Sequence, residues 1–169
     1  MGADFEKIFR ENKDSLFNFV YRMTGDYHLT EDILQDVFFK VYKGLGQFEG
    51  RSSIKTWLFK IAINSTNDEM RRKNRFFKVF RTYDDGMDIS SGLDIEKELL
   101  IKESRSVLQK ELNKLKNDIR AVLLLFYFEG LKIEEISQIT GKSKENVKVM
   151  LHRGRNTLKK RLKRYGYDV

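Results

Sequence analysis

The sequence predicts an all-α protein made of two small helical domains joined by a flexible acidic linker, the C-terminal domain containing a helix-turn-helix. Three observations support this prediction. Proline is absent and only 11 of the 169 residues are glycine, so the chain lacks the turn residues that strand-rich folds need. Apolar residues recur at intervals of three and four through most of the chain, which is typical of amphipathic helices. Charge alternates from basic to acidic to basic along the sequence, which divides the chain into two parts.

The charge pattern locates the domain boundary. Segment 51–81 has nine Lys or Arg against two acids, segment 84–103 has seven acids against two Lys, and segment 142–164 has ten Lys or Arg against Glu145 alone. Two anion-binding surfaces separated by an acidic connector have this pattern. Gly, Ser and Asp dominate DDGMDISSGLD at 84–94, as in flexible linkers. We therefore expect domains at 1–80 and 99–169 and a linker at 81–98.

Three helices are expected in the N-terminal domain. The first ends at Thr24-Gly25-Asp26, and Thr30 is expected to cap the second because acids follow it in the first turn. The third helix is expected from about Ser53 to Asn74, with Trp57 in the core. The residues that share the apolar face of the first helix are Phe5, Ile8, Phe9, Leu16, Phe17, Val20 and Met23.

Four helices are expected in the C-terminal domain, at 99–115, 118–129, 133–140 and 143–165. Gly130 is expected to be the C-cap of the second of these.

The last two helices form a helix-turn-helix pattern. Isoleucines at 133, 136 and 139 face inward, Gly141 permits a sharp turn, and Ser143 caps the following helix. The expected buried positions of that helix are Val147, Leu151 and Leu158. Its outward face carries the basic and hydrogen-bonding residues of a DNA recognition helix, namely Lys144, Lys148, His152, Arg153 and Arg155. Basic residues expected to continue this face as phosphate contacts are Lys159, Lys160, Arg161, Lys163 and Arg164.

Several classes of function lack support in the sequence. Cysteine is absent and His28 and His152 are the only histidines, so we expect no disulfide, no metal site and no cofactor. No glycine-rich phosphate loop and no paired catalytic carboxylates occur, so an enzyme is not expected. The N-terminus lacks the pattern of a secretory signal, and no apolar run is long enough to span a membrane. We therefore expect a cytoplasmic protein without direct membrane insertion.

The net charge of +8 favours an anionic partner, but it leaves alternatives open. A basic helix pair also occurs as a solvated surface. A stand-alone helix-turn-helix transcription regulator, a nucleic-acid enzyme and a protein bound at a membrane surface are further hypotheses. The basic helices lack the aromatic opposing face of membrane-surface helices, which disfavours the last of these.

Two motif blocks resemble the extracytoplasmic-function family of RNA polymerase sigma factors. TEDILQDVFFKVYK at 30–43 and FEGRSSIKTWLFKIAINSTNDEMRRKNR at 48–75 are similar to the second domain of that family. The segment from Leu112 onward, beginning LNKLKNDIRAVLLLFYFEG, is similar to its fourth domain. The resemblance implies an alternative sigma factor, which directs core RNA polymerase to chosen promoters and helps to open them. In a stand-alone helix-turn-helix regulator, by contrast, the DILQDVF helix and the glycine-bounded loop before Trp57 would have no role.

The resemblance also assigns roles to individual residues. It places core polymerase docking on Asp32, Gln35, Asp36 and Phe39. It places recognition of the single-stranded −10 element on Phe48, Gly50, Arg51, Ser52, Ser53, Lys60, Asn64, Asn67, Arg71 and Arg72, with Asn64 facing a base flipped out of the stack. It places recognition of the duplex −35 element on Lys144, Lys148, Val149, His152 and Arg153, with Arg155 on phosphate. The family is commonly held inactive by an anti-sigma factor, so such a partner is expected.

The sequence departs from the family pattern at three places. Lys116 stands where the family often has proline, and Lys132 stands where it often has a capping Ser or Thr. Glu49 and Arg51 change the usual order of charges in the loop, which affects the expected base preference.

Overall fold

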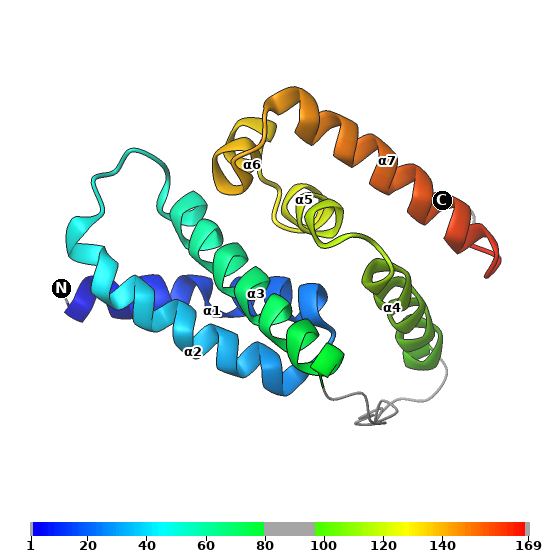
Figure 1. The fold of residues 1–169 in the computed structure, drawn as a ribbon, viewed down its shortest axis with the longest axis horizontal. Coiled ribbons are helices and arrows are strands. Elements are labelled where there is room, and N and C mark those ends of the chain that lie inside the picture. Colours follow the sequence, from blue (N-terminus) through cyan, green and yellow to red (C-terminus); the bar gives the residue numbers. More distant parts are fainter. Residues whose placement is uncertain (1, 80–96, 168–169) are drawn as a thin grey trace.

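A computed structural model describes residues 2–79 and 97–167, with side chains described for 4–76 and 104–167. Every regular element in these ranges is a helix (Figure 1), which confirms the all-α prediction. Residues 81–96 of the predicted linker lie outside the described residues. We call residues 2–79 the N-terminal unit and residues 97–167 the C-terminal unit.

The N-terminal unit is built from α1 (Gly2–Thr24), α2 (Tyr27–Gly44), the short 3-10 helix η1 (Leu45–Gln47) and α3 (Ile54–Val79). All three α-helices contact one another. Their facing sides supply a buried core of Leu16, Phe19, Val20, Met23, Ile33, Val37, Val41, Leu58, Phe59 and Ala62. Burial of such apolar side chains, about 1.5–3 kcal/mol each, holds the three helices together.

The start of α2 differs from the prediction. Asp26, not Thr30, is the N-cap, and its carboxylate accepts a hydrogen bond from the main-chain N–H of Leu29 at 3.0 Å. Thr30 lies buried inside the first turn, where its hydroxyl donates to the carbonyl of Asp26 at 2.7 Å. Both residue types suit an N-cap, but only Asp26 has the extended backbone that a cap requires, with φ −129° and ψ 119°.

The C-terminal unit is built from α4 (Lys97–Asn113), α5 (Asn117–Tyr127), α6 (Ile133–Thr140) and α7 (Lys144–Lys163). The predicted helix-turn-helix is formed by α6 and α7. Gly141 has φ +68°, and the Ser143 hydroxyl accepts from the N–H of Asn146 at 3.2 Å, so both predicted turn residues are confirmed. Gly130 is not the C-cap of α5. That helix ends at Tyr127, and Gly130 has φ +66° in the turn that follows.

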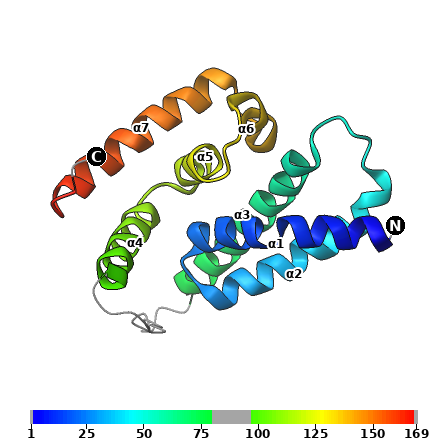
Figure 2. The ribbon, with the colours of Figure 1, turned by 180° about the vertical axis from the view of Figure 1, so that it is seen from behind.

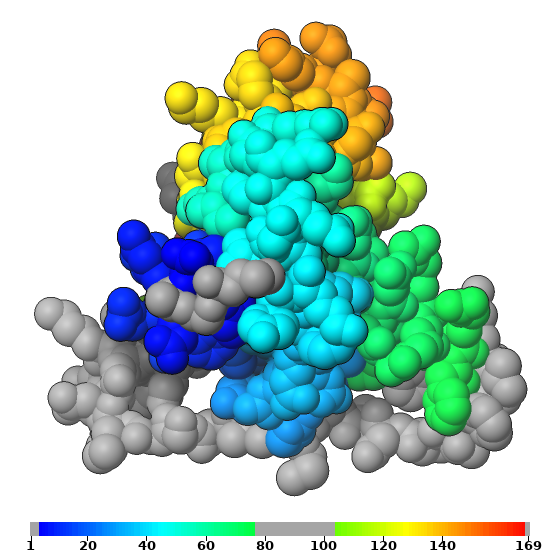
Figure 3. Space-filling view, turned by 90° about the vertical axis from the view of Figure 1, so that its left-hand side faces the viewer, coloured from blue at the N-terminus to red at the C-terminus, as the bar shows by residue number. Residues whose placement is uncertain are grey.

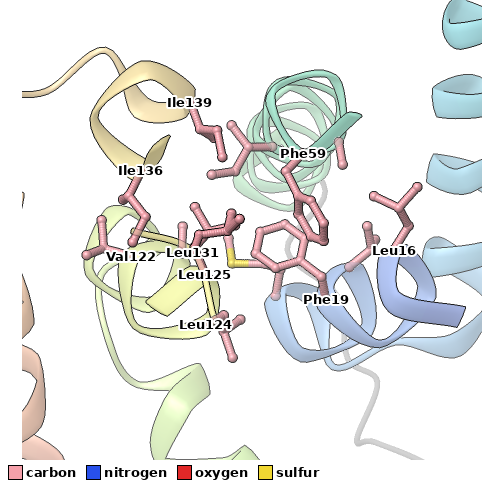
Figure 4. Close-up of a cluster of buried hydrophobic side chains, with 14 of the residues drawn as sticks. Leu16, Phe19, Phe59, Val122, Leu124, Leu125, Leu131, Ile136 and Ile139 are labelled. Carbon is pink, nitrogen blue, oxygen red and sulfur yellow. The ribbon is translucent and has the colours of Figure 1, made fainter. Parts of the chain in front are cut away.

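The two units pack directly on each other. Helix α3 contacts α6, and α1 contacts both α4 and α5. The views from front and back show α5 and α6 beside α1 and α3 (Figures 1 and 2). A close-up shows Phe19 and Phe59 facing Leu124, Leu125 and Leu131 (Figure 4). One apolar core therefore spans both units. The units are joined by this packing as well as by the linker that the sequence predicts.

No described helix is both long and apolar enough to cross a membrane.

Candidate nucleic-acid interface

The outer face of α7 is fixed by how its inner face packs on α5. Val147, Met150 and Gly154 are buried, whereas Leu151 and Leu158, which we expected to be buried, are only half-buried. Helix α7 comes very close to α5 at Gly154. A Cβ there would lie 2.7 Å from Ile119 Cγ2 and 2.8 Å from a methyl of Leu123. The missing side chain lets the two helices meet and rigidly orients the opposite face of α7.

The exposed sides of α7 carry every residue predicted for −35 recognition. All are exposed, and they are Lys144, Lys148, Val149, His152, Arg153 and Arg155. Lys144 forms an ion pair with Glu134 at 3.3 Å, and the Nε2 atom of His152 shares a hydrogen bond with Asn156 Nδ2 at 3.0 Å. Asn156, which the sequence prediction did not include, is exposed beside His152. Exposed ion pairs contribute little to stability, so Lys144 is readily available to DNA.

One basic residue of α7 faces away from this surface. Arg161, which we expected to contact phosphate, is half-buried, and its Nε lies 3.7 Å from a carboxylate oxygen of buried Glu111. The same carboxylate accepts hydrogen bonds from Lys114 at 2.5 Å and from the Tyr165 hydroxyl at 2.9 Å. These contacts hold the pKa of Glu111 below its usual value, and the hydrogen bond from Lys114 is the main cause. Arg161 therefore joins α7 to α4 within the C-terminal unit, and it does not extend the exposed basic face.

The loop between η1 and α3 is anchored by aromatic packing at its base. The rings of Phe48 and Trp57 lie 5.0 Å apart, and a Cβ on Gly44 would come within 3.0 Å of Trp57. Trp57 is partly buried against the core, as expected. At the tip, Gly50 has φ +68°, and Arg51 pairs with Glu49 at 2.6 Å. Phe48 and Ser52 are half-buried, whereas Gly50, Arg51 and Ser53 are exposed.

Helix α3 carries the rest of the predicted −10 surface. Lys60, Asn64, Asn67 and Arg71 recur at intervals of three and four, so they lie along one stripe of the helix. Asn64 is exposed, and its amide has no hydrogen-bond partner within the described parts of the chain. Arg71 and Arg72 pair with Asp68 and Glu69, each at 2.9 Å. The loop at 48–53 leads directly into α3, the helix that carries these residues.

The predicted docking residues lie on α2. Asp32, Gln35 and Phe39 are exposed, and the Lys43 ammonium lies 4.6 Å from the centroid of the Phe39 ring. Asp36 is more constrained, because Lys40 and Ser65 donate hydrogen bonds to its Oδ2 at 2.6 and 2.8 Å.

The surroundings of Asp36 also shift its ionisation. Burial opposes its charged form, but the hydrogen bonds outweigh that cost and hold the pKa of Asp36 below its usual value. Because Ser65 directly follows Asn64, the docking face and the −10 stripe meet at this network.

The residues predicted for −10 recognition lie in the N-terminal unit, and those predicted for −35 recognition lie in the C-terminal unit. Seen from the side, the loop and the end of α2 lie on one face with the helix-turn-helix above them (Figure 3). Within the described residues no group of His, Asp and Glu could hold a metal ion. The geometry defines a helical DNA-binding protein with a helix-turn-helix and a second, loop-containing basic surface.

Comparison with known proteins agrees with this class. Residues 8–76 match the family Sigma-70 region 2, and residues 105–158 match Sigma-70, region 4. The RNA polymerase sigma factor YlaC of Bacillus subtilis (strain 168) is 33% identical over 157 residues, covering 93% of this chain and 91% of that protein. The ECF RNA polymerase sigma factor SigW of the same organism is 30% identical over 168 residues, covering 95% and 88%.

A solved structure shows the same architecture. The sigma factor RpoE of Bartonella quintana, in complex with the anti-sigma factor NepR, superimposes with a TM-score of 0.78 at 25% identity, covering 95% of this chain and 97% of that one. The chain therefore belongs to the extracytoplasmic-function family of RNA polymerase sigma factors, and it is an alternative sigma factor. A stand-alone helix-turn-helix regulator would not account for the match of the N-terminal unit to Sigma-70 region 2.

Proposed function

We propose that the chain directs core RNA polymerase to promoters by contacting the −10 element with its N-terminal unit and the −35 element with its C-terminal unit. The observation that carries this proposal is that each unit of this sigma-family chain exposes basic and amide side chains, on α3 in the N-terminal unit and on α7 in the C-terminal unit. The functional division follows the predicted boundaries, 1–80, 81–98 and 99–169.

The −10 surface has the chemistry to hold an opened strand. Unpairing a base costs a few kcal/mol, so a site that captures the extruded base favours melting. The free amide of Asn64 both donates and accepts, which suits recognition of a base edge. The loop around Gly50 forms the wall beside it, while Lys60, Arg71 and Arg72 supply positive charge for the strand backbone.

The −35 surface has the geometry of a recognition helix. Its N-cap, Ser143, and its first turns project into the major groove, so Lys144, Lys148 and Val149 reach base edges. His152 and Arg153 follow one turn later. Arg155 lies further round the helix and contacts phosphate, which adds affinity without sequence preference.

Docking to core polymerase occurs through the exposed side of α2. Carboxylates at Asp32 and Asp36, the amide of Gln35 and the ring of Phe39 form a small patch with an apolar centre. Charge on such a patch steers and orients a partner more than it adds affinity. An anti-sigma factor is a second protein partner, as it is for RpoE of Bartonella quintana. Tyr127 and Phe128, which are 52% and 45% exposed, offer apolar surface for such a contact.

We propose no catalytic step and no cofactor, since recognition and strand capture need only binding groups. The site of action is the cytoplasm, where promoter DNA and polymerase meet. Run-off transcription with purified core polymerase tests the proposal. The chain should yield a promoter-dependent transcript that core polymerase alone does not make, and a charge-reversed Asp32→Lys, Asp36→Lys variant should not. Equal transcription by that variant and the natural chain would contradict docking through α2.

A further inference from the structure

Asn156 and His152 form a hydrogen-bonded pair on the exposed side of α7. They are four residues apart, so one turn of the helix places their side chains next to each other. The amide nitrogen Nδ2 of Asn156 lies 3.0 Å from Nε2 of the His152 ring. Both residues are exposed, whereas Gly154 between them is buried against Ile119 and Leu123 of α5. The pair therefore projects outward from a closely packed part of the helix.

The chemistry of the two nitrogen atoms fixes the state of the ring. An amide nitrogen carries two hydrogens and can only donate, so Asn156 is the donor and Nε2 of His152 is the acceptor. An imidazole nitrogen accepts only when it carries no proton, so the ring is neutral and its one proton lies on Nδ1. In the described part of the chain nothing accepts from that Nδ1. His152 therefore offers DNA a single free polar group, an N–H donor.

A neutral donor differs from the charged groups around it. The hollow beside the pair is lined by residues that include the cations Arg153, Lys159, Lys160 and Lys163. Positive charge is attracted to phosphates in any DNA sequence, so it adds affinity without base preference. A neutral N–H group gains little from phosphate charge and depends on an acceptor at one place.

The major groove distinguishes bases by such acceptors. Guanine presents N7 and O6, adenine presents N7 and thymine presents O4, whereas cytosine presents the amino donor at N4. A donor held in one tautomer therefore favours guanine, adenine or thymine over cytosine at the base that it meets. A ring that exchanges between tautomers would present an acceptor for part of the time, and this preference would weaken.

We propose that Asn156 is a positioning residue for −35 recognition. It holds His152 in the tautomer with the proton on Nδ1, so that the ring donates to one base edge and selects against cytosine there. Asn156 thus sets sequence preference by acting through His152. This inference rests on the proposed −35 role of α7.

The tautomer is measurable on the full chain without DNA or polymerase. His28 and His152 are the only histidines, so nitrogen-15 NMR distinguishes their rings. At about pH 8, where an imidazole is neutral, His152 should show a protonated Nδ1 and an unprotonated Nε2. In Asn156→Leu, which removes the donor at similar size, both signals should move toward the average of the two tautomers. Identical His152 signals in the two proteins would overturn the positioning role.

His28 is the internal control of this measurement. It is exposed on α2, and its Nδ1 lies 3.7 Å from a carboxylate oxygen of Glu31. Its signals should be the same in the natural chain and in Asn156→Leu, because the substitution lies in the other unit.

Base preference is measurable by binding of the holoenzyme to promoters in which each −35 base is changed in turn. At one position, His152→Ala should reduce the preference over cytosine by about fivefold, the effect of one hydrogen bond. Asn156→Leu should reduce the same preference at the same position by about threefold, because part of the population keeps the proton on Nδ1. Asn18→Leu, the same change at an exposed position of α1, should leave it unchanged.

A double-mutant cycle separates positioning from direct contact. In a His152→Ala background, Asn156→Leu should have no further effect on base preference, because the ring through which it acts is gone. An equal effect of Asn156→Leu in both backgrounds would show that Asn156 itself reads a base, and it would overturn the inference.

Failure of this inference is distinguishable from failure of the proposed function. If His152→Ala keeps the full base preference, the proposed −35 contact of His152 is wrong and the inference falls with it. If His152→Ala loses the preference and Asn156→Leu keeps it, the −35 contact stands and only the positioning role is overturned.

Discussion

The guanidinium of Arg120 in α5 donates a hydrogen bond to the main-chain carbonyl of Met23, the penultimate residue of α1. The same buried group donates to Leu112 at 2.8 Å and to Asn113 at 2.6 Å, at the end of α4. Carbonyls at helix C-termini lack partners within their own helix and carry partial negative charge. One side chain of the C-terminal unit thus caps a helix in each unit.

Replacing Arg120 should weaken both the C-terminal unit and the interface. Arg120→Met leaves buried carbonyls without donors, so we expect a loss of about 3 kcal/mol in the free energy of unfolding. Urea unfolding followed by circular dichroism measures this loss. Arg105→Met, an exposed arginine of α4, is the control and should change stability by less than about 0.5 kcal/mol. A loss no larger than that of the control would show that Arg120 is not a structural cap.

Gly154 should tolerate no larger side chain. Gly154→Val places methyl groups against Ile119 and Leu123, where even a Cβ would lie under 3.0 Å from both. Overpacking typically costs about 1–3 kcal/mol, which exceeds the gain in helix propensity over glycine. Thermal unfolding should detect a lower melting temperature, whereas Lys160→Val on the exposed side of α7 should cause little change. Equal stability of the two variants would refute close packing of α5 and α7.

Glu111 should make the C-terminal unit sensitive to acid. Its pKa is lowered in the folded state, chiefly by the hydrogen bond from Lys114, so its contribution is present above the unfolded pKa of about 4.3 and is lost as pH falls through the folded value. Glu111→Gln should cost about 2 kcal/mol at pH 7, and this difference should shrink below about pH 4. Unfolding of both proteins across this pH range measures the effect. A difference independent of pH would contradict it.

Asn64→Ala should impair promoter opening without loss of polymerase binding. The exposed amide makes no hydrogen bond within the described residues, so its loss should remove the proposed base contact and leave the fold intact. We expect open-complex formation to fall by about tenfold or more, equivalent to 1–3 kcal/mol of a specific base contact. Permanganate reactivity of the −10 strand and a run-off assay measure it, with Asn74→Ala on the same helix as control. Full activity of the Asn64 variant would exclude this role.

Replacing Arg153 and replacing Arg155 should affect promoter binding in different ways. Arg153→Ala should weaken dependence on the −35 sequence by about 1–3 kcal/mol, since it removes a contact to a base edge. Arg155→Ala should weaken binding to all −35 sequences alike and reduce the salt slope by about 0.9, as loss of one phosphate contact does for duplex DNA. Binding of the holoenzyme to promoters with and without the −35 element separates the two. Identical behaviour of both variants would refute the assignment.

Local sequence patterns predicted the helices well because they depend on neighbouring residues. The interval 133–140 and the turn at Gly141 and Ser143 agree with the structure, since periodicity and capping determine them. The cap at Asp26 was missed because Thr30 offers the same chemistry four residues later, and only the backbone conformation decides between them. A sequence therefore predicts that a helix is present more reliably than it predicts the residues at which the helix begins and ends.

Contacts between the units could not be predicted from periodicity. Arg120 looks like a surface residue in sequence, and Lys55 donates a hydrogen bond to the main-chain oxygen of Glu129, 74 positions further along the chain. One signal was present, namely the run Ala121–Leu125, which is buried at every position. A helix apolar on all sides has neighbours all round, and α5 indeed packs on α7 on one side and on α1 on the other. The site residues on exposed faces came from the family resemblance, because exposure alone assigns no role.

The most direct test of the central claim is reconstituted transcription with core polymerase on a promoter library in which the −10 and −35 elements and their spacing vary. We predict that transcripts arise only when both elements are present at a fixed spacing, that Asn64→Ala loses discrimination at −10, and that Arg153→Ala loses it at −35. Failure of the purified chain to bind core polymerase, or transcription indifferent to one of the two elements, would contradict the account.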